Sequence, residues 1–190
     1  MLDANGGGTI AGVLAGLDYI LGERFAAPKD EPMIINLSFG GAFSTVLNDA
    51  VEACVDAGIP TIVAAGNDRM DACSVSPASA KGVITVAATT KEDTLADFSN
   101  QGSCVNILAP GVGIPSASSE SAYALRILSG TSMAAPHVTG AVALYLEENP
   151  TDTPKQVAKA LAKSGAADKI SWIYPESGTP NLMLRTKKLI

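Results

Sequence analysis

Gly130-Thr131-Ser132-Met133-Ala134-Ala135-Pro136-His137 is the most informative stretch of this 190-residue chain. We predict a strand over Ala122–Leu128, a break at Gly130 and a long helix over Thr131–Glu147. This arrangement places the Ser132 hydroxyl at a helix N-terminus, where unpaired N–H groups and the helix dipole favour developing negative charge. An acyl-transfer nucleophile needs such a place for its oxyanion. Pro136 is expected in the first helical turn, where its missing N–H costs little.

Around this stretch, aliphatic runs alternate with amphipathic stretches. Buried strands are predicted over Met33–Ser38, Pro60–Ala65, Val83–Ala88 and Val105–Leu108. Helices are predicted over Thr9–Phe25, over Ser44–Ala57 with Ser44 as N-cap and Gly58 as stop, and over Lys155–Lys163 after the capping box Thr153-Pro154-Lys155-Gln156. Strands and helices that alternate with short connections predict one α/β domain with a mostly parallel sheet. Met1-Leu2-Asp3 is typical of a strand end, so we expect the chain to begin inside a domain.

The composition excludes several classes of protein. Hydrophobic residues make up 47% and charged residues 17%, which is typical of a globular chain. The net charge is −6 and the basic residues are scattered, so no nucleic-acid partner is expected. The apolar runs, such as Ile59–Ala65, are too short to cross a bilayer, and no signal peptide is recognisable. One histidine and no Cys-x-x-Cys pair argue against a zinc site.

As a whole, the string from Gly130 to His137 closely resembles the nucleophile signature of the subtilisin-like serine proteases, the subtilases. An isolated Gly-Thr-Ser would more simply be a helix cap, but the eight-residue match favours Ser132 as the nucleophile. Ala64-Ala65-Gly66-Asn67 is similar to the subtilase segment whose asparagine amide completes the oxyanion hole, which implies that role for Asn67.

Two further segments resemble the edges between which subtilases take up an extended polypeptide substrate by main-chain hydrogen bonds. They are Ile35–Gly41 and Asn5-Gly6-Gly7-Gly8. The substrate-binding residues that the resemblance implies are Gly6, Gly7, Gly8, Ser38, Phe39, Gly40, Ala65 and Gly66.

The likeness is greatest to the proteinase K and aqualysin-like subgroup, through Asp71–Ala78 and Phe98–Cys104. In that subgroup, cysteines that match Cys73 and Cys104 form a disulfide, which implies an oxidising compartment and a secreted protein. Cys54 lies on a predicted helix and is expected to be a buried free thiol. A second disulfide of aqualysin-like enzymes is absent, because Ala4 replaces its cysteine.

The resemblance implies no cofactor for catalysis, but structural calcium is common in the family. Relatives commonly have an aspartate where this sequence has Asn106. Calcium sites depend on charged oxygen ligands, so we expect a site there to be weakened or lost.

A serine protease also needs a histidine base and an aspartate that orients it. His137 is the only histidine, and it follows Ser132 by five residues on one predicted helix. It is therefore rotated by about 140° and displaced by roughly 7.5 Å, out of reach of the hydroxyl. In subtilases the two other triad residues lie upstream of the matched region, and Asp18 and Asp30 fit no triad motif.

The resemblance therefore implies that residues 1–190 are the C-terminal two-thirds of one subtilase catalytic domain. The expected architecture is a subtilisin-like three-layer α/β sandwich that lacks its N-terminal strands. We expect an endopeptidase by family that is inactive alone, with the N-terminal part of its own domain as a partner.

Three alternative functions compete with this interpretation. A non-catalytic peptide-binding remnant would keep the cleft without the chemistry. An α/β-hydrolase is disfavoured because Ala134 stands where its motif has glycine and no histidine follows His137. Dinucleotide binding lacks its Gly-x-Gly-x-x-Gly signature.

Overall fold

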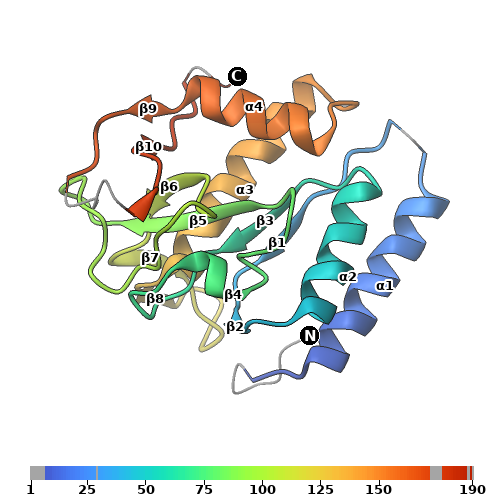
Figure 1. Cartoon of the computed structure of the whole chain (residues 1–190), viewed down its shortest axis with the longest axis horizontal. Coiled ribbons are helices and arrows are strands. Elements are labelled where there is room, and N and C mark those ends of the chain that lie inside the picture. Colours follow the sequence, from blue (N-terminus) through green and yellow to red (C-terminus); the bar gives the residue numbers. More distant parts are fainter. Residues whose placement is uncertain (1–6, 29, 172–176, 188, 190) are drawn as a thin grey trace.

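A computed structural model of the chain describes residues 7–28, 30–171, 177–187 and 189. A central sheet lies between two layers of helices (Figure 1). The helices are α1 (Ile10–Ala26), α2 (Thr45–Asp56), α3 (Thr131–Glu148) and α4 (Pro154–Ser164), with a 3₁₀ turn η1 at Ala72–Ser74. Met1–Asp3, the expected strand end, and Ala4 and Gly6 lie outside the described residues.

The main sheet has the strand order β1–β3–β5–β6–β10–β9. Its members are β1 (Ile35–Leu37), β3 (Thr61–Ala64), β5 (Ile84–Thr89), β6 (Ile107–Pro110), β9 (Ala166–Ala167) and β10 (Leu182–Met183). All neighbours are parallel except β9, which runs antiparallel to β10. This arrangement confirms the expected mostly parallel α/β sheet.

The two faces of the sheet carry separate hydrophobic cores. On one face, Ile62 and Val86 pack with α3 and α4 residues such as Val138. On the other face, Val63 of β3 and Leu37 of β1 pack with residues of α1 and α2. Because strand side chains alternate between faces, the mostly apolar strands β3 and β5 are buried on both sides. The three layers follow from this pattern.

The local signals at the helix ends act as the sequence indicates. The hydroxyl of Thr9 accepts a hydrogen bond from the Gly12 N–H at α1, and that of Ser44 accepts one from the Leu47 N–H at α2. Thr153 and Gln156 form the predicted capping box of α4. The described residues include no helix that is long and apolar enough to span a membrane.

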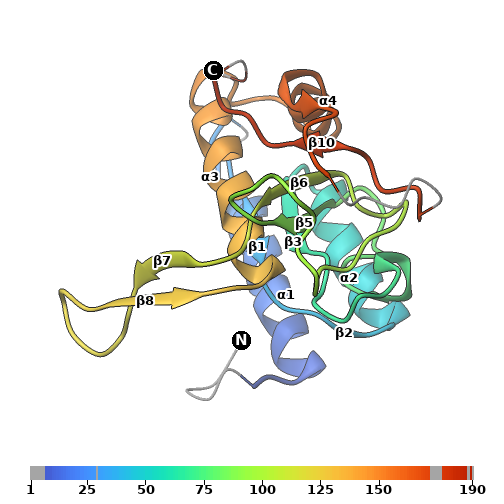
Figure 2. The same ribbon diagram turned by 90° about the vertical axis from the view of Figure 1, so that its left-hand side faces the viewer.

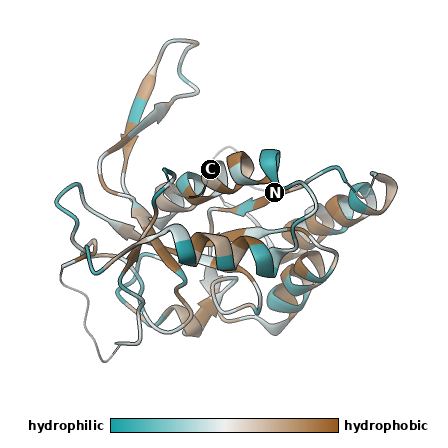
Figure 3. Cartoon of the chain, turned by 90° about the horizontal axis from the view of Figure 1, so that it is seen from above, coloured by the Kyte–Doolittle hydropathy of each residue, from teal (hydrophilic) through white to brown (hydrophobic). Residues whose placement is uncertain are grey.

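Two small antiparallel pairs were not predicted: β2 (Gly41–Ala42) with β4 (Val75–Ser76), and β7 (Ile114–Ala117) with β8 (Leu125–Leu128). The strand predicted over Ala122–Leu128 is thus confined to its second half. Figures 2 and 3 show the β7–β8 hairpin projecting from the body of the molecule. Its apolar side chains are exposed, and Tyr123 is 96% exposed.

Two other expectations are corrected. The strand expected at Val105–Leu108 begins two residues later, because the Asn106 N–H and side chain contact Thr85 before the ladder of β6 starts. Pro136 lies inside α3 rather than in its first turn. Its missing N–H leaves the Ser132 carbonyl, four residues earlier, without a helical donor.

Candidate active site

Ser132 lies where the sequence indicates, at the start of α3. The helix begins at Thr131 after the N-cap Gly130, so Ser132 is its second residue. Its side chain is half-buried and lines a cleft of about 570 Å³. The hydroxyl is therefore accessible and lies beside the unpaired N–H groups of the first helical turn.

Asn67 lies in the loop after β3 and is joined to the start of α3 by Thr131. The side-chain oxygen Oδ1 of Asn67 accepts hydrogen bonds from the Thr131 backbone N–H at 2.9 Å and from the Thr131 hydroxyl at 3.0 Å. The same hydroxyl accepts the Gly66 N–H at 3.1 Å. With its oxygen held twice, the Asn67 amide has one orientation, and its Nδ2 donor faces away from Thr131.

Gly130 leaves space beside this donor. A Cβ atom placed on Gly130 would lie 3.5 Å from Asn67 Nδ2 and 3.7 Å from the Ser132 backbone nitrogen. A side-chain donor and a backbone donor thus border the same opening next to the serine. Two N–H groups that converge beside a nucleophile are the arrangement that stabilises an oxyanion.

The cleft brings together half of the predicted substrate-binding residues, namely Phe39, Gly40, Ala65 and Gly66. Its lining residues include Phe39, Gly40, Gly41, Ala65, Gly66, Asn67 and Ser132. Ser38 instead lines a neighbouring groove along β1, together with Phe39. Gly7 and Gly8 are exposed residues before α1 and are not among those that line the cleft, and Gly6 lies outside the described residues.

His137 does not face the serine. It is exposed on α3, and its Nδ1 lies 2.8 Å from the Met133 carbonyl oxygen of its own helix, to which it donates. Cys54, the other possible nucleophile, is a free thiol buried in α2. Burial raises the pKa of this thiol and disfavours the thiolate.

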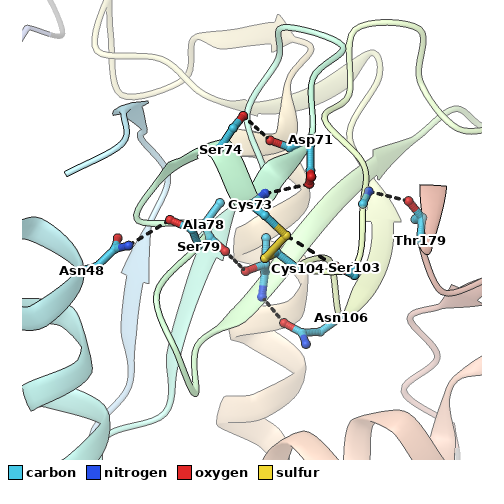
Figure 4. The surroundings of a disulfide bond; sticks show 12 residues. Asn48, Asp71, Cys73, Ser74, Ala78, Ser79, Ser103, Cys104, Asn106 and Thr179 are labelled. Carbon is cyan, nitrogen blue, oxygen red and sulfur yellow. Dashed lines mark hydrogen bonds between the residues drawn. A yellow bond between two sulfur atoms is a disulfide. The ribbon is translucent and has the colours of Figure 1, made fainter. Parts of the chain in front are cut away.

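The predicted disulfide joins Cys73 and Cys104, with 5.3 Å between their Cα atoms (Figure 4). It connects η1 to the loop that leads into β6. Next to it, the Asp71 carboxylate accepts the Cys73 N–H, and the Ala72 N–H donates to the Gln101 carbonyl. The covalent bond therefore joins η1, whose Ser74 lines the cleft, to the loop before β6.

We expect loss of this disulfide to lower the free energy of unfolding by about 3–4 kcal/mol, since the bond closes a loop of 31 residues. The measurement is urea unfolding of the chain and of the double variant Cys73→Ser, Cys104→Ser. A reducing agent should destabilise the unaltered chain and leave the variant unchanged. Equal unfolding midpoints for the unaltered chain and the double variant, both without reducing agent, would contradict the prediction.

Asn106 takes part in the sheet. Its Oδ1 accepts the Thr85 N–H at 2.7 Å, and its own N–H donates to the Thr85 carbonyl (Figure 4). The side chain offers a neutral oxygen that already has a donor, which fits calcium poorly. The described part of the chain contains no group of three or more His, Cys, Asp or Glu residues that could hold a metal ion.

Several residues of the site were not singled out from the sequence. Phe43, Met70 and Val75 give the cleft an apolar wall. Nothing local in the sequence indicates that these three side chains converge. Thr131 belongs to the decisive motif, yet its bonds to Asn67 span 64 residues and become visible only in the fold.

Comparisons with known proteins agree with this geometry. Residues 1–181 match the model of the subtilase family. An extracellular serine proteinase of Thermus sp. strain Rt41A is 46% identical over 98% of this chain and 44% of its own length. Alkaline serine exoprotease A of Vibrio alginolyticus is 41% identical over 90% of this chain and 31% of its own length. The chain spans less than half of each relative.

Among solved structures, a cold adapted subtilisin-like serine proteinase superposes with a TM-score of 0.89 at 40% identity. The match covers 98% of this chain and 64% of that one. Family model, relatives and fold agree with the motif around Ser132. The chain belongs to the subtilase family.

Proposed function

We propose that this chain supplies the nucleophile and the oxyanion donor of a serine endopeptidase that acts on extended polypeptides. The supporting observation is the Thr131–Asn67 contact, which holds the Asn67 amide beside Ser132. In the proposed reaction, Ser132 Oγ attacks the scissile carbonyl carbon and gives its proton to a base. The Asn67 side chain and the Ser132 backbone N–H stabilise the oxyanion, and the base then gives the proton to the amine, which leaves as the C–N bond breaks and the acyl-enzyme forms. Water then hydrolyses the ester.

The base and its aspartate come from another polypeptide segment in this proposal. His137, the sole histidine, is bound to its own helix and cannot take the proton of Ser132. The chain alone is therefore expected to be inactive. The segment that completes it corresponds to the N-terminal part of a subtilase catalytic domain, where the family carries its other two triad residues.

The open edge of β1 supports this partner. Within the described residues, β1 pairs with β3 alone, and the Ile35 N–H bonds to the Pro60 carbonyl. In a parallel ladder the main-chain groups of the next residue, Asn36, point to the opposite edge. A groove of about 430 Å³ runs there, lined by Ile20 and by residues 33–39. Helices cover both faces of this sheet, so an added apolar parallel strand fits the edge.

The β7–β8 hairpin adds a second surface for the same partner. Leu125 is 73% exposed and Ile127 is 68% exposed. Exposed apolar surface of this kind marks a contact site. An N-terminal segment that adds to β1 and covers the hairpin would bury both surfaces.

For the substrate, we propose main-chain pairing along Ser38–Gly40, with Ala65 and Gly66 on the opposite wall. Gly6, Gly7 and Gly8 are proposed as the second edge. We also propose an extracellular location, which the disulfide and the relatives named as extracellular support. We propose that any calcium site at Asn106 is weakened or lost, because the side-chain oxygen of Asn106 already accepts the Thr85 N–H.

A fluorophosphonate probe tests the proposal, because it labels only an activated serine. The chain alone should remain unlabelled, whereas the chain co-expressed with the N-terminal part of the Thermus relative's catalytic domain should be labelled at Ser132. Ser132→Ala is the control and should abolish labelling. A co-folded complex that binds peptide and is never labelled would instead support the second candidate, a peptide-binding remnant, which the glycine-rich cleft favours.

A further inference from the structure

We propose that Asn100 is a positioning residue, which holds the Asn67 side-chain amide where it can donate a hydrogen bond to the oxyanion. This inference rests on the proposed function, and it concerns a side chain outside the cleft. Asn100 is fully buried in the loop between β5 and β6. A buried carboxamide is costly unless its polar atoms are paired, so its contacts show what holds it there.

The Asn100 side chain bonds to the backbone on both sides of Asn67. Its Oδ1 accepts the Asp68 N–H and the Met70 N–H, each at 2.9 Å. Its Nδ2 donates to the Ala65 carbonyl at 2.9 Å. The Asn100 backbone N–H also donates to the Gly66 carbonyl at 2.9 Å. Four hydrogen bonds from one residue thus hold the loop immediately before and after Asn67.

Gly66 fits closely against this residue. A Cβ atom placed on Gly66 would collide with Asn100 Nδ2, and the φ of Gly66 is +104°, a value that disfavours other residues. The loop backbone therefore lies against the Asn100 amide. Asn67 is therefore fixed through the main chain of its loop by Asn100. Its side chain is fixed by the two Thr131 donors to Oδ1.

The hold of Asn100 on the Asn67 loop determines how well the oxyanion donor is preorganised. Oxyanion donors act through preorganisation, because they need no rearrangement when charge develops. If Asn100 loses its oxygen, the N–H groups of Asp68 and Met70 lose their acceptor and the loop gains freedom. Asn67 then samples several positions, and only some of them reach the opening beside Ser132.

The first test measures the order of the Asn67 side chain by ¹⁵N relaxation. In the unaltered chain the order parameter of its NH₂ group should be near the rigid value of about 0.85, and in Asn100→Leu it should fall below about 0.6. Asn48→Leu is the matched control, because Asn48 is also a buried asparagine but lies in α2 and donates to Ser79. It should leave Asn67 ordered. A folded Asn100→Leu with an unchanged Asn67 would overturn the inference.

The second test detects the Asn67 amide donor by its effect on peptide binding. An N-acetylated Ala-Ala-Ala-Phe tetrapeptide is titrated as the carboxylate and as the carboxamide, with Phe chosen for the apolar wall of the cleft. The unaltered chain and Asn48→Leu should prefer the carboxylate about tenfold, as expected for one hydrogen bond to a charged group. Asn100→Leu and Asn67→Ala should prefer it by less than about twofold.

These measurements distinguish the oxyanion role of Asn67 from the positioning role of Asn100. An unaltered chain without carboxylate preference would contradict the oxyanion role of Asn67, while the relaxation data still decide the role of Asn100. Should Asn100→Leu fail to fold, hydrogen exchange in the unaltered chain decides. The amides of Asp68 and Met70, both exposed residues, must exchange slowly if Asn100 holds them. Exchange as fast as in an unstructured peptide would overturn the inference.

Discussion

Chromogenic peptide hydrolysis should rise about 10⁶-fold in kcat when this chain is completed by the N-terminal part of a subtilase catalytic domain. The magnitude is that found for loss of the triad histidine in subtilisin. The physical reason is that Ser132 is a weak nucleophile until a base accepts its proton. The oxyanion donors alone leave a residual rate of roughly 10³–10⁴ over water.

The assay compares the chain alone, the co-expressed complex, and both with Ser132→Ala. In the complex, Ser132→Ala should remove the gain. Asn36→Pro tests the docking edge, because it removes an N–H that points away from β3, while Asn36→Ala keeps that N–H and serves as its control. We expect the proline variant to assemble poorly and the alanine variant to assemble normally. Turnover by the chain alone, lost in Ser132→Ala, would contradict the need for a partner.

The sequence was sufficient for the elements with strong local patterns. The strands β3 and β5 are mostly apolar and buried throughout because helices cover both faces of the sheet. The helix α4 has a capping box that can be read without any tertiary contact. For such segments, local preference and final environment agree.

The elements that escaped prediction lack that agreement. Strand β7 contains Pro115 and shows no alternation of buried and exposed positions, and its partner β8 was predicted only as part of a longer strand over Ala122–Leu128. The two-residue strand β10 joins the sheet beside β6 only through long-range pairing of Met183 with Leu108. Distant contacts of this kind leave no periodic trace in the chain.

The candidate site also combines residues that stand in local motifs with residues that only distant contacts reveal. Ser132 and Asn67 stand in motifs that the sequence displays, but their relation depends on Thr131 and on the fold. Asn100 follows Ser99 in a polar loop and precedes Gly102, so by pattern it is an ordinary turn residue. Only its burial and its bonds to Asp68 and Met70 distinguish it. Candidate residues that stand in motifs could thus be identified from the sequence, whereas the residues that hold them could not.

Asn67→Ala in the completed enzyme should lower kcat by roughly 10²–10³ and leave KM nearly unchanged. That magnitude belongs to the equivalent asparagine of subtilisin, and the geometry here gives the reason to expect it. The Nδ2 donor borders the opening beside Gly130 and the Ser132 backbone nitrogen, where we propose that the oxyanion forms. It therefore strengthens its bond only as the oxyanion forms, and its loss affects kcat.

A double-mutant cycle with Thr131→Val makes this expectation specific. Valine removes the hydroxyl that donates to Asn67 Oδ1 but keeps the backbone N–H that donates to the same atom. Alone, it should lower kcat by about tenfold, the value of one hydrogen bond. In the Asn67→Ala background the same change should have a smaller effect, because only the bond from the Gly66 N–H to the Thr131 hydroxyl remains to be lost. Independent, additive losses, or a rise in KM without a fall in kcat, would show that Asn67 binds the substrate rather than its transition state.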